Sequence, residues 1–265
     1  MNQAAPAWYF PSVRDLWRQH LDVIENGAAP EIGFRGAITR ATVVFIDMGG
    51  FTGRANEHAS DPAVAGFLGH HFASFIENWS LALKSDVRGV YLDKIVGDAV
   101  MLVIPGDGPS SISLGLKLAR ATLMGPGIYD PHIGLHAGDI CLCDVGLAAK
   151  INRTAAFEQI TVMGAVVNLA ARLASVADPG TVATIAEPIE DGGLTPVAQL
   201  DTLAANLLSV GSVVRKGLKG FRPGDVGVRM LSGSSVMRRD AIDVAEMLRR
   251  VAEMGRRLPR LRTES

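Results

Sequence analysis

The sequence predicts an α+β domain with a ferredoxin-like βαββαβ core and additional strands and helices. Short apolar runs rich in β-branched residues alternate with longer stretches in which apolar residues recur every three or four positions. From residue 41 their order is strand, helix, strand, strand, helix, strand, which is the order of that fold. The chain shows no internal repeat that would indicate a solenoid. Because many functions share this fold, the fold alone defines no activity.

Residues 1–40 are predicted to form an extension that precedes the main domain. A helix is expected over Val13 to Glu25, after an aromatic, proline-containing start. The stretch NGAAPEIGFRG (26–36) has the glycine, proline and asparagine typical of a linker. We therefore place the main domain at 41–233.

The first half of this domain contains three predicted strands and one long helix. ATVVFID (41–47) is apolar enough for a strand covered on both faces. Asp61-Pro62 begins a helix that continues to residue 84. In residues 89–106, two apolar strands flank Val96-Gly97-Asp98, a pattern that predicts a hairpin.

The second half repeats the alternation of helix and strand. Ser110 and Ser111 are candidate N-caps of a helix that ends near residue 125. HIGLHAGDICLCDVG (132–146) predicts two strands joined near Ala137-Gly138. The remaining elements are a helix at 164–177 and strands at 181–185, 211–220 and 226–231.

Residues 234–265 form a third region, predicted to be a basic amphipathic helix with an arginine-rich end. Such a helix could bind a protein partner or an acidic membrane surface, or pack against its own domain or dimer mate. We favour packing.

Composition excludes several classes of function. A formal net charge of −1 provides no overall field for gathering nucleic acid. No apolar run is long enough to span a bilayer, and the N-terminus lacks the pattern of a secretory signal, so we expect a cytoplasmic protein. Cys141 and Cys143 lie two residues apart in a strand-like run, where a disulfide is geometrically awkward. Without a nearby His/Cys pair to complete a metal site, they are best interpreted as small core residues.

Two aspartates follow apolar strands. Asp47 ends the run 41–47, and Asp98 lies at the tip of the predicted hairpin. Each has an ordinary interpretation, Asp47 as a cap of the following turn and Asp98 as a turn residue. Together they could bind Mg²⁺ or Mn²⁺ jointly with phosphate oxygens, because these cations prefer oxygen ligands.

Three other polar residues stand in apolar surroundings. Lys94 could extend to solvent, pair with Asp47, Asp93 or Asp98, or donate to a base or phosphate. Asn168 and Arg172 are four residues apart, so they share a helix face. That face could simply be solvated, or it could hold a sugar and a phosphoryl group.

Five blocks occur in a fixed order: FIDMGGFTG (45–53), KIVGDAV (94–100), GLHAGD (134–139), TVMGAVVNLAARL (161–173) and LKGF (218–221). In this order they resemble the catalytic domain of class III adenylyl and guanylyl cyclases, over roughly Ala41 to Leu231. No P-loop, zinc-binding HExxH helix or GGDEF-type signature is present.

The resemblance implies a role for each residue. Asp47 and Asp98 would hold two metal ions, Mg²⁺ or Mn²⁺, with the Met48 carbonyl as a further ligand. Lys94 and Thr161 fall on the positions that contact the purine. Asn168 falls on the ribose-orienting position, and Arg172 on the one that stabilises the transition state. Lys219 aligns with a lysine that contacts the triphosphate, although Lys216 is close by.

The resemblance also implies a homodimer with active sites shared between its subunits. The expected reaction is attack of the ribose 3′-OH of ATP on the α-phosphorus, which yields 3′,5′-cyclic AMP and pyrophosphate. Lys94 and Thr161 favour ATP, because family members that use GTP typically carry Glu and Cys at those positions. The alternatives are a cyclase for GTP or a pyrimidine nucleotide, and a non-catalytic regulatory module that binds nucleotide.

Two departures from the family pattern are visible. The loop at 147–160 is longer than in typical members, and Cys143 replaces a usual glycine. Neither change removes a predicted catalytic group.

Overall fold

The computed structural model describes residues 10–19, 34–51, 62–125, 130–145, 160–190, 193–221 and 225–233. The helices are α1 (Val13–Gln19), α4 (Pro62–Leu83), the 3-10 helix η2 (Lys84–Gly89), α5 (Pro109–Met124), α6 (Ala165–Val176) and α7 (Leu200–Ala204). The strands are β1 (Phe34–Met48), β2 (Tyr91–Val96), β3 (Ala99–Pro105), β4 (Pro131–Val145), β5 (Ile160–Met163), β6 (Thr181–Ile185), β7 (Ser209–Gly217) and β8 (Asp225–Ser232). The helix predicted over 234–265 and most of the loop at 147–160 lie outside these residues.

The eight strands form one mixed sheet in the order β2-β3-β1-β4-β6-β8-β7, with β5 paired to β4. All pairs are antiparallel except β4 with β6. The first four strands therefore lie in the order β4-β1-β3-β2, joined by α4 and α5, which is the ferredoxin-like arrangement. The predicted fold class is confirmed.

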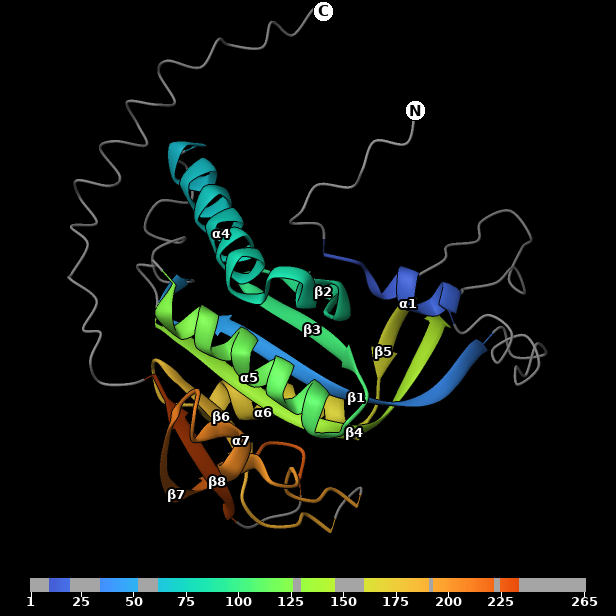
Figure 1. Ribbon diagram of the computed structural model, residues 1–265, viewed down its shortest axis with the longest axis vertical. Coiled ribbons are helices and arrows are strands. Elements are labelled where there is room, and N and C mark those ends of the chain that lie inside the picture. Colours follow the sequence, from blue (N-terminus) through green and yellow to red (C-terminus); the bar gives the residue numbers. More distant parts are fainter. Residues whose placement is uncertain are drawn as a thin grey trace, which may run out of the picture.

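Helices cover both faces of the sheet. Side chains of β1 alternate between the faces: Val43 belongs to one apolar cluster, and Val44 and Ile46 belong to the other. The Val43 cluster includes residues of α1 and α6, whereas the other includes residues of α4, α5 and α7. In Figure 1, α5 lies in front of the long strands β1 and β4, and α6 lies behind them. No helix in the described ranges is long and apolar enough to cross a membrane.

Two predicted strand boundaries are wrong. β1 begins at Phe34 rather than at residue 41, because residues 34–40 pair with 139–145 of β4. This antiparallel pairing overrides the linker-like composition of residues 34–36, and the rest of the predicted linker lies outside the described residues. β4 is one strand rather than two: Gly138 adopts a φ of 154°, and its pairing to β1 continues on both sides.

The helix ends also differ from prediction. The N-cap of α5 is Gly108, with Pro109 at the first helical position, which suits proline because no amide donor is needed there. Ser111 lies inside the first turn, where its hydroxyl donates to the Gly108 carbonyl. α1 ends at Gln19, and the rest of the helix predicted to Glu25 lies in the undescribed segment.

Candidate active site

Asp47 and Asp98 lie together in one pocket. Asp47 is the penultimate residue of β1, and Asp98 lies in the turn between β2 and β3. β1 pairs with β3, with Ile46 opposite Val100, so the ends of the two strands are adjacent. Both aspartates line a pocket of about 410 Å³ together with residues of β4 and α6, including His132 and Ser175. The two residues predicted to bind metal thus line the same pocket.

This pocket concentrates negative charge. Burial raises the pKa of Asp98, and the nearby carboxylate of Asp47 raises it further. The Asp47 carboxylate accepts a hydrogen bond from the Met48 amide at 3.1 Å. Neither aspartate forms a salt bridge with a basic side chain among the residues that the structure describes. The two carboxylates could therefore hold a cation.

His132 belongs to the same pocket, although the sequence did not single it out. It lies directly opposite Asp47 in the register of β1 and β4. Its Nδ1 is 2.8 Å from the Ala177 carbonyl oxygen, and because a carbonyl oxygen only accepts, Nδ1 is the donor in this contact. A Cβ atom at Gly49 would lie 2.7 Å from His132 Nε2 and 2.7 Å from the Asp130 carbonyl oxygen. Only glycine therefore leaves enough space at this position of the pocket. Only the pairing of β1 with β4 places His132 opposite Asp47, and this pairing cannot be read from the sequence of either strand alone.

Lys94 and Thr161 meet across β2 and β5. The Lys94 ammonium donates to the Thr161 hydroxyl at 2.7 Å. Both also contact Asp93, whose Oδ2 lies 3.0 Å from Lys94 Nζ and 3.2 Å from Thr161 Oγ1. The Val162 amide donates to Oδ1 of Asp93 at 3.1 Å. The two residues predicted to contact the purine are thus in direct contact.

A β-bulge explains how adjacent residues of β2 reach the same place. Leu92 pairs with Leu102 and Lys94 with Met101, so Asp93 is the extra residue of the strand. Without the bulge, Asp93 and Lys94 would face opposite sides of the sheet.

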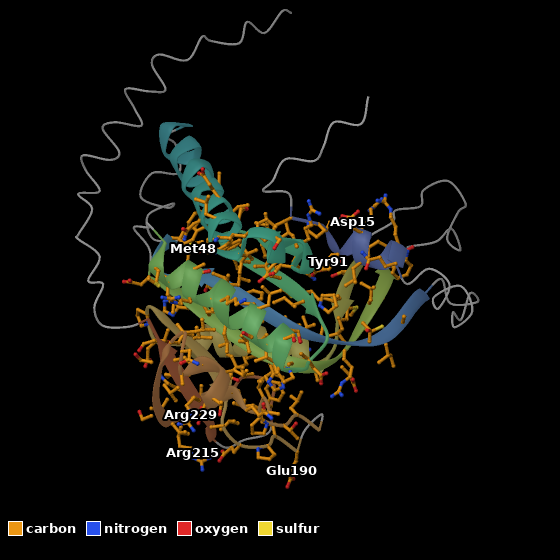
Figure 2. All side chains as sticks on the ribbon, in the orientation of Figure 1. Asp15, Met48, Tyr91, Glu190, Arg215 and Arg229 are labelled. Carbon is orange, nitrogen blue, oxygen red and sulfur yellow. The ribbon has the colours of Figure 1, made fainter. Side chains whose placement is uncertain are left out.

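Figure 2 shows Tyr91, at the start of β2, beside α1, whose Gln19 donates to the Tyr91 hydroxyl at 3.1 Å.

The Asp93 carboxyl group is buried at the centre of this cluster. Its side chain is 0% exposed. Burial raises its pKa, whereas Lys94, the Val162 amide and Thr161 oppose the rise. Cys143 lies behind Thr161, with its sulfur 3.5 Å from the Thr161 carbonyl oxygen. Burial, followed by the neighbouring Cys141, raises the pKa of Cys143 to about 11, so it is a thiol at neutral pH.

Asn168 and Arg172 are exposed on one face of α6, whose opposite face is buried through Leu169 and Leu173. Neither side chain lines the pocket of Asp47 and Asp98 in the same chain, where α6 contributes Ala174 and Ser175 instead. The structure therefore separates these two predicted residues from the aspartates.

Lys219 lies in the turn after β7, closed by a hydrogen bond from the Phe221 amide to the Leu218 carbonyl. Its side chain is exposed. Lys216, the neighbouring alternative, forms an ion pair with Asp178 at 3.1 Å. Lys219 is thus the better placed of the two to meet a ligand.

Comparisons with known proteins identify the fold. No family model matches the sequence, and no curated protein matches it. Among solved structures, the adenylyl cyclase CyaB from P. aeruginosa has a TM-score of 0.51 at 20% identity, over 77% of this chain and 98% of that one. The guanylyl cyclase Cya2 has a TM-score of 0.51 at 17% identity, over 75% and 94%. A bacterial light-regulated adenylyl cyclase has a TM-score of 0.50 at 12% identity, over 90% and 68%. At these identities the likeness establishes architecture alone: this chain has the fold of the adenylyl and guanylyl cyclase catalytic domains.

Proposed function

We propose that this protein is a class III nucleotide cyclase that converts ATP to 3′,5′-cyclic AMP and pyrophosphate in a homodimer. The observation that carries the proposal is the shared pocket of Asp47 and Asp98 in a domain of the cyclase fold. A carboxylate pair without a basic partner in the described chain suits a divalent cation. The five sequence blocks supply the remaining groups in the expected order.

The residues of the pocket fit two divalent metal ions, Mg²⁺ or Mn²⁺, shared with substrate phosphates. Asp47 and Asp98 would hold them, with the Met48 carbonyl as a further ligand. No three carboxylate, imidazole or thiol groups gather into a metal site within the described ranges, so phosphate oxygens would complete the coordination. When bound, such ions would lower the pKa of the 3′-OH and neutralise the leaving pyrophosphate.

Lys94 and Thr161 would bind the adenine base. Adenine presents an acceptor at N1 and a donor at N6, whereas guanine presents the reverse. The Lys94 ammonium can donate to N1, and the Thr161 hydroxyl oxygen can accept from N6. The 2.7 Å contact between Lys94 Nζ and Thr161 Oγ1 supports this proposal, because a donor and an acceptor lie next to each other.

Asn168, Arg172 and Lys219 would act on the sugar and phosphates across the dimer. In the reaction, the 3′-oxygen bonds to the α-phosphorus as the bond from that phosphorus to the bridging oxygen breaks. The 3′-OH loses its proton, and pyrophosphate leaves. Arg172 would stabilise the charge that develops on the α-phosphoryl oxygens. Because Asn168 and Arg172 do not line their own chain's aspartate pocket, a second protomer would supply them.

Product analysis tests the proposal. Purified protein is incubated with each of the four ribonucleoside triphosphates and either Mn²⁺ or Mg²⁺, and the products are separated by chromatography. We expect cyclic AMP from ATP, no product from Asp47→Ala, and full activity from Asp86→Ala, which removes an exposed carboxylate paired with Lys117. A cyclic product from another triphosphate only would change the assigned base. A stable dimer that forms no cyclic nucleotide with either metal would instead indicate a regulatory module.

A further inference from the structure

Asp93 is a buried group that the proposed reaction does not use. Its side chain is 0% exposed, and it occupies the bulge of β2 directly behind Lys94 and Thr161. A buried carboxylate costs free energy unless its oxygens are well paired. Here Oδ1 accepts from the Val162 amide, and Oδ2 accepts from Lys94 and lies within hydrogen-bond distance of Thr161. Asp93 is therefore held at the centre of the predicted base-binding cluster.

The contacts of Asp93 determine which way the Thr161 hydroxyl points. A carboxylate only accepts hydrogen bonds, so the hydroxyl must be the donor in its 3.2 Å contact with Oδ2 of Asp93. The other acceptor within reach of the hydroxyl is the Val162 carbonyl, which is neutral and farther away at 3.5 Å. With its one hydrogen directed at Asp93, the hydroxyl oxygen presents lone pairs only. One receives Lys94 at 2.7 Å, and the other remains for a ligand.

We propose that Asp93 is a positioning residue that sets the base preference of this site by holding Thr161 as a hydrogen-bond acceptor and Lys94 as a donor. This inference rests on the proposed function. An adenine N6 amino group can donate to the free lone pair of Thr161. In the same place, the O6 atom of guanine would face the Thr161 hydroxyl oxygen. Both atoms are acceptors and no hydrogen lies between them, so this contact is unfavourable.

Substitution of Asp93 by asparagine should relax this preference. The asparagine amide group can donate to Thr161, which frees the hydroxyl hydrogen to point toward the base. We expect the ratio of kcat/KM for ATP to that for GTP to fall by about tenfold. Lys94 still favours an acceptor at the N1 position, so the preference should not vanish. The cluster would then accept O6 at Thr161 almost as well as N6.

A double-mutant cycle separates positioning from mere structural support. Thr161→Val removes the hydroxyl, so Asp93→Asn added to that variant should leave the ATP to GTP ratio unchanged. A purely structural Asp93 would instead lower kcat/KM for both nucleotides equally in both backgrounds. Should Asp93→Asn not fold, as judged by loss of the cooperative thermal transition, Asp93→Glu is compared with Asp93→Gln. Glutamate should keep the ATP preference, and glutamine should lower it.

The outcomes distinguish this inference from the proposed function. If the unsubstituted chain cyclises ATP but Asp93→Asn keeps the same ATP to GTP ratio, Asp93 does not set base preference and the proposed function stands. If Asp93→Asn lowers the ratio only when Thr161 is present, the inference is supported. If the unsubstituted chain cyclises no triphosphate, both are overturned.

Discussion

Substitution of Gly134 by alanine tests how closely α6 packs on the sheet. A Cβ atom at Gly134 would lie 1.9 Å from the Ala170 carbonyl oxygen and 2.5 Å from the Ala174 amide nitrogen, both in the backbone of α6. Real Cβ contacts are essentially never shorter than 3.0 Å, so the helix must move by about 1 Å. Overpacking of this kind destabilises a domain by about 1–3 kcal/mol. We therefore expect the Tm to fall by roughly 2–12 °C.

The same displacement should lower activity, because α6 carries Asn168 and Arg172. A misplacement of about 1 Å at a reacting centre can reduce the rate by about 100-fold. The assay compares thermal unfolding and cyclase turnover of Gly134→Ala with those of Gly69→Ala. Gly69 lies on α4, and a Cβ atom added there would have no atom of the described residues within 4 Å, so alanine should leave both quantities unchanged or raise stability slightly. Unchanged Tm and turnover in Gly134→Ala would refute this account of α6 packing.

Two further predictions concern charge. Arg172→Ala should lower kcat more than it raises KM, because its contact strengthens as charge develops in the transition state; steady-state kinetics showing weaker ATP binding at unchanged kcat would contradict this. Burial lowers the pKa of His136 from 6.5 to about 4, so the unfolded chain binds a proton there before the folded chain does. The contribution of neutral His136 to the free energy of unfolding is fully present above pH 6.5 and is lost as the pH falls toward about 4. We expect the free energy of unfolding, measured with urea, to fall by about 2 kcal/mol between about pH 7.5 and about pH 5, and to fall less in His136→Gln. Equal decreases in both proteins would refute the assignment of this pH dependence to His136.

Local patterns were sufficient for most of the fold. The apolar runs at 41–47 and 181–185 lie within strands, and the three- and four-residue spacing at 164–177 corresponds to α6. The local sequence does not predict the start of β1 at Phe34, because that start depends on pairing with β4, a contact between distant segments. The sequence predicts a turn at Gly138, since a glycine that permits a bend within a strand has the same local sequence signal.

In the candidate site, too, some residues can be predicted from local sequence and others depend on contacts between distant segments. Asp47, Asp98 and Lys94 stand out in the sequence by their apolar surroundings, whereas Thr161 is indicated only by the resemblance that the ordered motifs carry. The contributions of His132 and Asp93 depend on register: His132 lies opposite Asp47 across two strands, and the bulge in β2 turns Asp93 toward Thr161. Neither a cross-strand pair nor a bulge can be identified from one strand alone.

In the proposed enzyme each active site takes residues from two protomers, and mixed dimers of two variants reveal whether this is so. Asp47→Ala lacks a metal-binding carboxylate, and Arg172→Ala lacks the transition-state arginine, so each homodimer should form almost no cyclic AMP. After the two variants are unfolded and refolded together, half of the dimers should be mixed, each with one intact site. Cyclic AMP formation should then recover to about a quarter of that of the unsubstituted protein. A mixture that contains mixed dimers but stays as inactive as its parents, beside an active unsubstituted protein, would contradict the shared site.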